Sequence, residues 1–484
     1  MSGDLAGILP EIVVAGGGLL LLVLPRVRAP RLLGLITLAF LAAAFDLKLL
    51  AWSARPFPQS LFYGLLKEDG FSLFFQLLIL VSIGFVTLSI MGYGRQEVKA
   101  RRELYALLLL TTVGLMLVVG AQHLALVYVG LETISLFSYL LTGFLKRESL
   151  SAEGALKYFL FGSLASGVLL YGISLLYGLT GTMDLPGLAD RLTPVMAQAH
   201  WAASISLLFL LVGLSFKVAL VPFHMWAPDA YEGAPTPVAA FLSLGPKLAG
   251  FALLVRVFLV GISPQLGLWP DLLVLLSILT MTVGNLAALA QTNVKRLLAY
   301  SSIAQAGTMA IGLAVATPMG LTATLYYLLA YLLMNVGAFV GVIAVGNAGG
   351  REDLGAFSGL SRKEPLLAAM IAVSFLSLAG IPPMAGFFAK LWIFGAALKA
   401  NAVGLAVVAA VNSVVALFYY MKVVKAMYLD PPTAGAPAIP RSRSLGLALG
   451  LCTVGLFAVG LWPGIWLTLS ANALPFPLPA GRFP

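Results

Sequence analysis

Residues 365–398 read PLLAAMIAVSFLSLAGIPPMAGFFAKLWIFGAAL, a 34-residue run in which Lys390 is the one charged side chain. As one straight helix this run would measure about 51 Å at about 1.5 Å per residue, whereas the hydrocarbon core of a bilayer is about 30 Å thick. Its centre, GIPPMAG at residues 380–386, contains the two residue types that most readily end a helix. We therefore predict a membrane-crossing helix that is broken at its centre.

The whole chain shares this apolar character. Of its 484 residues, 60% are hydrophobic and 10% are charged, and the mean hydropathy is +1.00. Soluble domains are about 45–50% apolar and about 25% charged, so the composition excludes an ordinary soluble protein. Apolar runs such as residues 104–120 are continuous, whereas the strands of a membrane β-barrel alternate apolar and polar residues. The sequence predicts an all-α, polytopic membrane protein.

Hydropathy and helix-breaking residues predict about fourteen transmembrane helices in a single membrane domain, residues 1–484. The expected spans are 5–24, 31–53, 70–93, 104–120, 122–145, 154–180, 203–222, 237–260, 271–290, 297–316, 318–346, 365–398, 403–428 and 445–470. We group them as three N-terminal helices (1–103), two five-helix units (104–260 and 261–428) and a C-terminal helix (429–484). The first span has no basic start and no small-residue cleavage site, so we expect it to be retained.

Two pentapeptides indicate an internal repeat. GLSFK at residues 213–217 and GFFAK at residues 386–390 each end in a lysine inside an interrupted apolar segment. These segments are the seventh and twelfth spans, which are the fourth members of the two five-helix units. Interrupted helices in corresponding halves are typical of carriers with inverted repeats, where they mark the transport site. We therefore predict two inverted repeats in which helices 7 and 12 are broken.

Basic residues are concentrated in the loops that follow odd-numbered spans. The main contributors are Arg26, Arg28, Arg31, Arg95, Lys99, Arg101 and Arg102. Because Lys and Arg accumulate in cytoplasmic loops, we expect these loops in the cytoplasm and both termini on the outer, periplasmic side. The same bias accounts for the net charge of +10, so nucleic acid is not an expected partner.

The sequence carries no motif for redox or nucleotide chemistry. Its single cysteine, Cys452, allows neither an internal disulfide nor a cysteine-ligated iron–sulfur cluster, and the His and Cys spacing predicts no metal site. It contains neither a GxxxxGK(S/T) phosphate loop nor a GxGxxG dinucleotide motif. Moving one charge outward costs about 2.3 kcal/mol per 100 mV. We therefore expect the energy for transport to come from a partner or from another ion gradient.

Four charged residues lie deep in the expected spans, namely Glu132, Lys217, Lys247 and Lys390. An ionised group at the centre of a membrane helix costs about 2.5–3.5 kcal/mol on insertion scales, so we expect these side chains to face an internal, hydrated region. Burial disfavours the charged form of such groups, which lets them exchange protons near neutral pH and titrate as a coupled set. The pattern predicts that protons pass along the row.

Structural roles are the alternatives for these residues. Glu132 could be a structural acid that is bonded to Ser135, three residues further along the same helix. Lys217 and Lys247 could form ion pairs with carboxylates, although apolar spans offer few. These readings predict static contacts, whereas the functional reading predicts groups that can release a proton.

Three basic groups near helix breaks or ends have alternatives of the same kind. Lys390 could cap the carbonyls that the prolines at 382 and 383 leave free. Lys157 could pair with Glu153, four residues earlier on one helix face. His224 lies beside a proline, so it could relay protons near neutral pH or hydrogen-bond the disturbed backbone.

Two other charged residues lie near the ends of their spans. We expect Glu11, in the first span, to contact water or a partner. We expect Arg256, in the eighth, to extend to the interface or to meet an acid on another chain. Neither residue is assigned to the transport row.

Several long motifs resemble those of the antiporter-like membrane subunits of respiratory complex I. They are LVPFHMWAPDAYEGAPTPVAA at residues 220–240, GPKLAG at 245–250, GLET at 130–133, NVKRLLAYSSIA at 293–304 and SLAGIPPMAGFF at 377–388. The resemblance extends from about Leu9 to the end of the last expected span. These subunits belong to a superfamily that they share with Mrp-type sodium/proton antiporters.

Within this family the chain is most similar to the N-type subunits of proton-pumping NADH:quinone oxidoreductase. Three features favour that type: LPE at residues 9–11, a chain that ends soon after the last span without a long lateral helix, and Lys390 where M-type subunits usually have glutamate. One departure is Gln305, where many relatives have histidine. A titrating relay at this point of the tenth span is therefore in doubt.

The resemblance implies a role for each candidate residue. A half-channel from the cytoplasm would end at Lys217, whose proton affinity Glu132 modulates. Lys247 would be the central connector and Lys390 the donor on the exit side. His224 and Lys157 would be accessory members of the path.

The resemblance also implies partners and a location. The chain itself would hold no cofactor, and FMN, iron–sulfur clusters and quinone would reside in partner subunits. Its neighbours would be other membrane subunits, a peripheral redox arm reached through them, and the lipid of a bacterial plasma (inner) membrane. The rival hypotheses are a subunit of a multi-chain sodium/proton antiporter and a scaffold whose proton path is vestigial.

Overall fold

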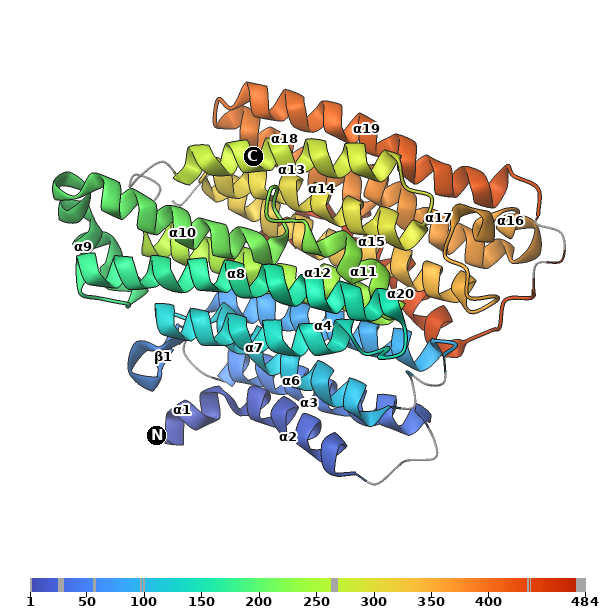
Figure 1. Ribbon diagram of the computed structural model, residues 1–484, viewed down its shortest axis with the longest axis horizontal. Coiled ribbons are helices and arrows are strands. Elements are labelled where there is room, and N and C mark those ends of the chain that lie inside the picture. Colours follow the sequence, from blue (N-terminus) through green and yellow to red (C-terminus); the bar gives the residue numbers. More distant parts are fainter. Residues whose placement is uncertain are drawn as a thin grey trace.

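The computed structural model describes residues 2–24, 30–54, 58–95, 98, 101–262, 269–432, 435 and 437–475. Its helices run side by side along the longest axis of the molecule (Figure 1). Within these residues twelve helices are long and apolar enough to cross a membrane. The other two expected spans, 5–24 and 365–398, contain shorter helices of 15 residues.

The N-terminal part forms three long helices and a small hairpin. Its elements are α1 (Ser2–Gly7), α2 (Leu9–Val23), α3 (Pro30–Ala54), β1 (Gln59–Leu61), η1 (Phe62–Gly64), β2 (Leu66–Glu68) and α4 (Gly70–Gly92). The two strands pair antiparallel, with Gln59 opposite Glu68. The all-α prediction is confirmed for the rest of the described chain but missed this hairpin, because strands of three residues show too little alternation to be recognised.

The middle part contains the first expected five-helix unit. Its elements are α6 (Arg102–Val119), α7 (Leu124–Thr142), α8 (Ser149–Thr180), α9 (Leu185–Gln198), α10 (His200–Val218), α11 (Trp226–Gly233), α12 (Thr236–Leu254) and the π-helix η2 (Val255–Gly261). The helix α9 was not expected. It is short and amphipathic, so hydropathy alone does not mark it.

The C-terminal part contains the second expected unit and the last span. Its elements are α13 (Trp269–Leu289), α14 (Val294–Ala314), α15 (Pro318–Gly346), η3 (Leu354–Phe357), α16 (Leu360–Lys363), α17 (Pro365–Ala379), α18 (Ala385–Lys399), α19 (Val403–Tyr428), α20 (Arg443–Leu461) and α21 (Pro463–Asn472). The last expected span, 445–470, is thus divided. Pro463 stands at the start of α21, where its missing N–H does no harm.

The seventh expected span, 203–222, is interrupted, and its helix ends before the expected bound at residue 222. The helix α10 ends at Val218 because Ala219 adopts a left-handed backbone conformation with φ of 60°. Pro222 follows and has no N–H to donate, and the chain becomes helical again as α11. Residues 226–233, which hydropathy assigned to a loop, therefore form a second helical piece.

The break expected within residues 380–386 is present. The helix α17 ends where Gly380 has a φ of 89°, and α18 begins at Ala385. At Gly386 the two helices approach closely, since a Cβ there would lie 1.9 Å from the carbonyl oxygen of Ser377. A larger residue at this position would force α17 and α18 apart.

The helix α12 lies at the centre of the bundle. All of its residues are buried, and it touches α4, α6, α7, α10, α11, α14 and α15. Its buried length continues into η2, where Arg256 is also buried. Side chains on α12 therefore meet protein on every side.

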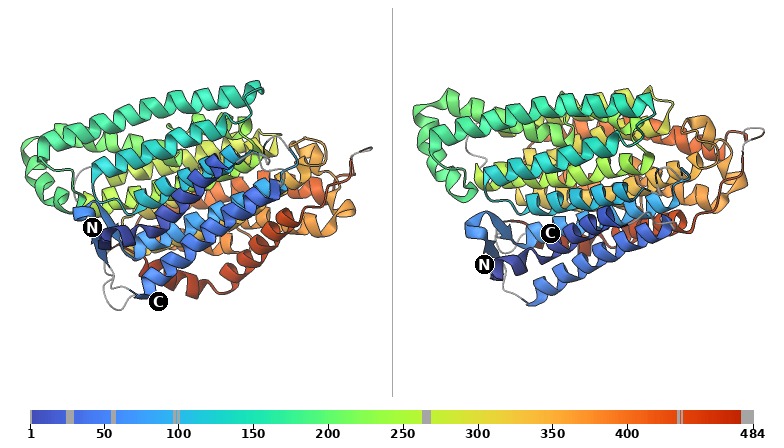
Figure 2. Two further views of the ribbon diagram at one scale, coloured as in Figure 1. Left: turned by 90° about the horizontal axis from the view of Figure 1, so that it is seen from below. Right: turned by 60° about the horizontal axis from the view of Figure 1, so that its bottom comes forward.

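The described part of the chain begins and ends at the same end of the bundle, which we call the hairpin end. There the carboxylate of Asp4 accepts a hydrogen bond from the Phe62 N–H at 3.2 Å. The Asn472 carbonyl oxygen lies 3.2 Å from where a Cβ on Gly70 would be. Figure 2 shows the hairpin and α9 at this end, and α16 at the opposite end.

The opposite end, which we call the basic end, joins loops that are far apart in sequence. The Gly94 N–H donates a hydrogen bond to Oδ1 of Asn347 at 2.7 Å, which connects the ends of α4 and α15. This end carries Arg95, Arg102, Arg296 and Arg351. Arg26, Arg28 and Lys99, which contributed to the charge bias, lie outside the described residues.

Candidate functional site

Lys217 occupies the last turn of α10, directly before the interruption, and is 2% exposed. Its Nζ donates a hydrogen bond to Oγ of Ser135 on α7 at 2.7 Å. Ser135 in turn donates to the carbonyl oxygen of Leu131 within its own helix at 2.7 Å. The structural alternative, an ion pair with a carboxylate, is wrong for Lys217 within the described chain, because no such pair is formed there.

Glu132 lies on α7, three residues before Ser135, and is half-buried. It accepts a hydrogen bond from Ser166 on α8. The alternative that paired Glu132 with Ser135 is wrong, because the Ser135 hydroxyl donates its proton to the Leu131 carbonyl oxygen. The charge of Glu132 still acts on Lys217 without a direct ion pair. This geometry lets the charge of Glu132 influence the proton affinity of Lys217 without an ion pair that would hold the proton on Lys217.

Lys247 lies on α12 and is 1% exposed. Its Nζ donates a hydrogen bond to the carbonyl oxygen of Ser302 on α14. The Ser302 hydroxyl lies 3.4 Å from the hydroxyl of Tyr231 on α11. No carboxylate forms an ion pair with Lys247 in the part of the chain that the structure describes, so the paired alternative is wrong here too.

The helices that carry Lys217 and Lys247, α10 and α12, pack against each other. Gly250, one turn after Lys247, faces this contact, since a Cβ on Gly250 would lie 3.5 Å from Cβ of Lys217 and 2.5 Å from Val218. Hydrogen bonds among the described side chains do not connect the two ammonium groups. Transfer between them therefore needs a rearrangement of side chains or intervening water.

A separate hydrogen-bond network leads from α14 toward the second break. The hydroxyl of Ser301 lies 2.5 Å from that of Tyr420 on α19. Gln305, one turn further along α14, donates to the Tyr420 hydroxyl at 3.0 Å and to the Leu378 carbonyl oxygen at 3.2 Å. Its Oε1 accepts a hydrogen bond from Tyr327 on α15. The glutamine that departs from the family pattern thus shares the Leu378 carbonyl oxygen with Lys390.

Lys390, on α18, completes this network and is 7% exposed. Its Nζ donates to the carbonyl oxygens of Leu378 at 3.1 Å and Ala379 at 2.8 Å. In a continuous helix these two carbonyls would bond the N–H groups of residues 382 and 383, which are prolines. The capping contact proposed as an alternative for Lys390 is therefore present.

A small cavity of about 10 Å³ lies beside Lys390. Its lining includes polar side chains from three helices, namely Asn285, Gln305, Thr308, Asn412, Ser413 and Tyr419. Asn285 and Asn412 are hydrogen-bonded to each other at 3.0 Å. The space suffices for about one water molecule among polar partners, and Lys390 is one of the residues that line it.

Lys157, at the basic end of α8, belongs to an ionic cluster. Its Nζ lies 2.6 Å from Glu153 and 2.7 Å from Asp229 on α11. Asp229 also pairs with Arg296 on α14 at 2.9 Å, and Arg296 pairs with Glu232. The expected Lys157–Glu153 pair is present, but it is one contact of a larger network that joins three helices.

Sequence reasoning missed Asp229, Glu232 and Arg296 as members of this cluster. All three stood inside quoted motifs, yet the first two were assigned to a loop between spans. Their acidic and basic character within otherwise apolar motifs was the available signal. Their partners became evident only once α11 was placed against α8 and α14.

His224 lies in the turn between α10 and α11 and is buried. Its Nδ1 makes no hydrogen bond within the described chain. The structure thus brings His224 close to the first interruption without connecting it to Lys217. Its candidate role as a proton relay remains a prediction.

Arg256 does not reach the interface, as had been expected. It is fully buried, and its two terminal nitrogens lie 2.8 and 2.6 Å from the carboxylate oxygens of Asp69. Its Nε also donates to the Val119 carbonyl oxygen at 3.1 Å. The acid that it meets is in the same chain, so both earlier expectations for Arg256 are wrong.

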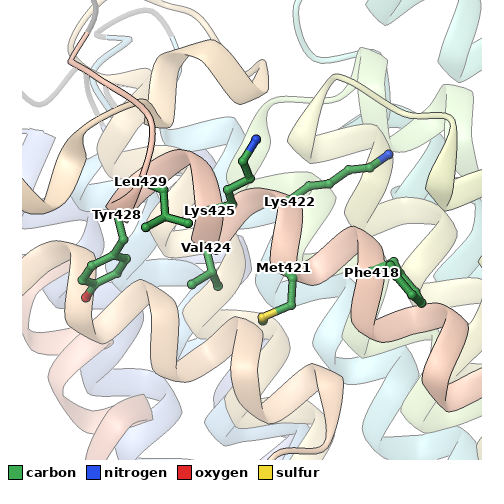
Figure 3. A pocket seen from close by; sticks show the side chains of 7 residues that line it. All are labelled: Phe418, Met421, Lys422, Val424, Lys425, Tyr428 and Leu429. Carbon is green, nitrogen blue, oxygen red and sulfur yellow. The ribbon is translucent and has the colours of Figure 1, made fainter.

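A groove of about 530 Å³ runs along α19 and contains none of these residues. Figure 3 shows Lys422 and Lys425 pointing away from Met421 and Val424 on this helix. The Lys422 ammonium is bonded to the Leu289 carbonyl oxygen at 2.5 Å. Because its cations do not converge, the groove offers no alternative centre for proton transfer.

Comparison with known proteins agrees with this arrangement. The family described as "NADH:quinone oxidoreductase/Mrp antiporter, TM" matches residues 121–416, which include Glu132, Lys217, Lys247, Lys390 and both interruptions. The chain belongs to this family. It is a multi-pass membrane protein, and the sequence resemblance to antiporter-like subunits is confirmed.

Curated relatives match over nearly the whole chain. A protein of Anaeromyxobacter sp. (strain Fw109-5) named NADH-quinone oxidoreductase subunit N is 40% identical and covers 94% of this chain and 93% of its own. A protein of the same name from Rhodospirillum rubrum is 41% identical and covers 92% of each chain. The similarity to N-type subunits is therefore confirmed at the level of complete chains.

Solved structures show the same fold. A chain of respiratory complex I from Thermus thermophilus with bound aureothin is 38% identical, with a TM-score of 0.81 and coverage of 96% of this chain and 99% of that chain. A chain of the Mrp complex from Dietzia sp. DQ12-45-1b is 25% identical, with a TM-score of 0.84 and coverage of 97% and 96%. Both structures are chains within membrane assemblies.

Proposed function

We propose that this family member is a proton-translocating membrane subunit of NADH:quinone oxidoreductase. One observation carries the proposal. Lys217, Lys247 and Lys390 are buried in the bundle, and each is bonded to a hydroxyl or carbonyl oxygen, with no carboxylate in an ion pair within the described residues. A buried ammonium with neutral partners can release its proton more readily than one that is held by a carboxylate.

In the proposed path, Lys217 receives a proton from the basic end. The helix α11 extends from the interruption toward that end, where Asp229 and Lys157 offer polar groups at the entrance. Glu132 modulates the proton affinity of Lys217 through its charge, and His224 is an accessory acceptor in the turn. These roles follow the family pattern and are supported by where the side chains lie.

Lys247 then acts as the central connector and Lys390 as the exit-side donor. Two contacts of α14 support this order: Lys247 is bonded to the Ser302 carbonyl oxygen, and Gln305, on the same helix, shares the Leu378 carbonyl oxygen with Lys390. Gln305 does not titrate, so its contribution is to orient its neighbours. From Lys390 the proton leaves toward the hairpin end, to which α18 leads.

The repeat organisation and the orientation are part of the same proposal. The units 104–260 and 261–428 each contain a helix that ends in a residue of positive φ and resumes after prolines, at α10–α11 and α17–α18. We place the basic end in the cytoplasm and the hairpin end, with both ends of the chain, on the outer side of a bacterial plasma membrane.

Electron transfer belongs to the partners in this proposal. The curated relatives are named as subunits of an oxidoreductase, and this chain would contribute the membrane step. FMN, iron–sulfur clusters and quinone would be held by other subunits, and neighbouring antiporter-like subunits would couple to this chain. The energy of quinone reduction would reach the lysines through these contacts.

A sodium/proton antiporter subunit is the second candidate, favoured by the TM-score of 0.84 to a chain of the Mrp complex. The relatives named subunit N match at higher identity over almost the same length. Isolation of the native assembly in mild detergent distinguishes the two. Flavin and iron–sulfur proteins should co-purify with this chain, whereas their absence would favour the antiporter.

The function is tested by replacing Lys217 with Ala in the assembled complex. We expect NADH-driven proton uptake by reconstituted vesicles, measured per NADH oxidised, to fall. The matched control is Lys425→Ala, because Lys425 is an exposed lysine on α19 outside the row. An unchanged proton-to-NADH ratio in Lys217→Ala would refute the proposal, and full stoichiometry in a double Lys217→Ala/Lys247→Ala variant would favour a vestigial path.

A further inference from the structure

A second group of buried charges lies outside the lysine row. Glu11 on α2, Lys48 on α3 and Glu68 at the end of β2 meet near the hairpin end, and Glu11 and Lys48 are each 2% exposed. The Nζ of Lys48 lies 2.8 Å from Oε1 of Glu11 and 2.9 Å from Oε1 of Glu68. The expectation that Glu11 contacts water or a partner is therefore wrong. We call these three residues the acid–lysine cluster.

A buried amide holds the same two carboxylates. Nε2 of Gln76 on α4 lies 3.2 Å from Oε1 of Glu11 and 3.1 Å from Oε1 of Glu68. The same nitrogen lies 3.2 Å from the carbonyl oxygen of Met116 on α6. Ammonium and amide thus both bridge the two acids through one oxygen of each.

With every group ionised, the cluster carries one negative charge in excess. Two carboxylates face one ammonium, and burial makes an uncompensated charge unfavourable. When two carboxylates share a site, the charge on each also opposes ionisation of the other. One bound proton would make the cluster neutral.

The charged groups around the cluster do not supply the missing positive charge. Asp69, next to Glu68, forms a neutral pair with Arg256 of η2. Lys67 on β2 is a further cation, but it lies toward Asp69 at 3.9 Å and its side chain is 33% exposed, so water screens its charge from the buried carboxylates. Asp4 on α1 is acidic and is bonded to the backbone of η1. The excess charge therefore stays with the cluster.

Two buried oxygen atoms point independently to a bound proton. Oε2 of Glu11 and Oε1 of Gln76 are buried and accept no hydrogen bond within the described chain. Both can only accept while Glu11 is ionised, and buried acceptors without a donor are rare in folded proteins. A proton on Oε2 of Glu11 converts that atom into a donor and removes the excess charge in one step.

We propose that Glu11, Glu68 and Lys48 form a proton-binding site in which the two carboxylates share one exchangeable proton. The site is separate from the row of Lys217, Lys247 and Lys390, and the proposal does not depend on the proposed pumping function. Its ligand is a proton, because the ammonium of Lys48 already occupies the position between the carboxylates that a metal cation would need.

The proton has a short route to the aqueous phase at the hairpin end. A groove of about 410 Å³ there is lined by Pro58, Gln59, Ser60, Tyr63, Gly64, Lys67, Gln122, Asp184 and Pro186. Successive residues of a strand point to opposite faces. Lys67 therefore lines the groove, whereas Glu68, the next residue of β2, points inward. The acid–lysine cluster thus lies directly behind the strand that borders the groove.

The site is also connected to the central helix. Asp69 follows Glu68 and binds both terminal nitrogens of Arg256, which lies on the continuation of α12. Lys247 is on the same helix. A change in the charge of the acid–lysine cluster therefore acts on β2 and on the Asp69–Arg256 pair, which hold α12 in place.

The shared proton can be counted by infrared difference spectroscopy of the isolated membrane assembly during a pH titration. Protonated carboxyl groups have a carbonyl band of their own. We expect Glu11→Gln and Glu68→Gln each to remove the band of one carboxyl group. After either change, the remaining carboxylate and Lys48 are neutral together and need no proton.

Three further variants test whether the two carboxylates share a single proton. The double variant Glu11→Gln/Glu68→Gln should lose no more band than either single variant, because one proton is shared. Lys48→Met should gain a second carboxyl band, because both acids then need a proton, and it keeps the proposal testable if a glutamine variant fails to assemble. Glu103→Gln, an exposed acid on α6, is the control and should change nothing in this band.

Other outcomes would overturn the proposal. An unchanged band in both single variants would mean that the cluster holds no proton. Additive losses in the double variant would mean that each acid holds its own proton. Loss of the band on adding sodium at constant pH would replace the proton with a metal cation.

Discussion

The acid–lysine cluster and its neighbour Asp69–Arg256 contrast with the row of Lys217, Lys247 and Lys390. Near the hairpin end, each buried cation lies within 3 Å of a carboxylate. In the row, the ammonium groups are bonded to a serine hydroxyl or to backbone carbonyls. Both regions are buried, so burial alone does not decide whether a cation is paired with a carboxylate or bonded to a neutral oxygen.

The difference lies in what is left when a proton departs. Removing the charge from a paired cation leaves its carboxylate buried and unpaired, which is strongly unfavourable. Removing a proton from Lys217 leaves Ser135 with its bond to Leu131, and therefore strands no charge. Neutral partners thus permit deprotonation where ionic partners resist it. In the proposed row, the lysines can release their protons because no carboxylate of the described residues forms an ion pair with them.

The largest expected effect is the loss of the paired cation Arg256. Arg256→Met leaves Asp69 buried without its partner and should lower the free energy of unfolding by about 3–5 kcal/mol. Thermal denaturation of the isolated assembly measures the change. Arg351→Met is the control, because the Arg351–Asp353 pair is exposed. A loss for Arg256→Met no larger than that of Lys217→Met would remove the contrast between the two regions.

A smaller effect is expected at Lys390, the row member that also caps a helix. In Lys390→Met the Ala379 carbonyl oxygen loses its donor, whereas that of Leu378 still accepts from Gln305. One unsatisfied buried acceptor should lower the free energy of unfolding by about 1–3 kcal/mol. Denaturation of this variant beside Lys399→Met, an exposed lysine on the same helix, tests it. Equal stability of the two variants would mean that the capping contact contributes nothing.

At Lys217 the hydroxyl partner should matter for proton affinity more than for stability. Ser135→Ala removes one hydrogen bond to the ammonium, worth about 1.5 kcal/mol for a charged donor. Lys217 should then hold its proton about tenfold less tightly. The alkaline limb of the pumping-rate profile should shift by about one pH unit toward lower pH. The buried serine on α10, in Ser206→Ala, should leave the profile unchanged.

The smallest effect is the pH dependence of the paired region near neutrality. Burial raises the pKa of Asp69, but the hydrogen bonds and charge of Arg256 outweigh it and hold that pKa below its usual value. The contribution of Asp69 to stability is therefore complete above the unfolded pKa of about 3.9 and is lost as the pH falls through the folded pKa.

Asp69→Asn tests this pH dependence while keeping a residue that caps helices well at the start of α4. The stability difference between wild type and variant should be constant from about pH 6 to 8 and should shrink only below about pH 4. Unfolding midpoints at several pH values measure it. A difference that already shrinks near neutral pH would place Asp69 with the titrating groups.

Local chemistry explains what could be predicted. The break at residues 380–386 was predictable because glycine and proline act on their own backbone. The depth of Lys217, Lys247 and Lys390 followed from hydropathy, and all three are buried as expected. The end of the seventh span was predicted less well, because Ala219 has no intrinsic preference for the left-handed conformation that it adopts.

Partner choice could not be predicted, because it depends on packing between distant segments. Arg256 and Asp69 are 187 residues apart, and the local sequence around each residue does not indicate that the other is its partner. Glu11 was expected at an accessible span end, yet α3, α4 and β2 enclose it. Gln305 was noted as a departure from the family, but its bonds to Tyr420 and Leu378 required α14, α17 and α19 to be placed together.

By itself, the sequence determined that this is a bundle of membrane-length helices with a few ionisable residues inside, because hydrocarbon length and helix-breaking residues are local properties. Tertiary structure alone decided which of those charges are paired and which are held by neutral oxygens. That distinction depends on contacts of about 3 Å between helices that are far apart in the chain. It is also the distinction that separates cations held by a carboxylate from cations that can release a proton.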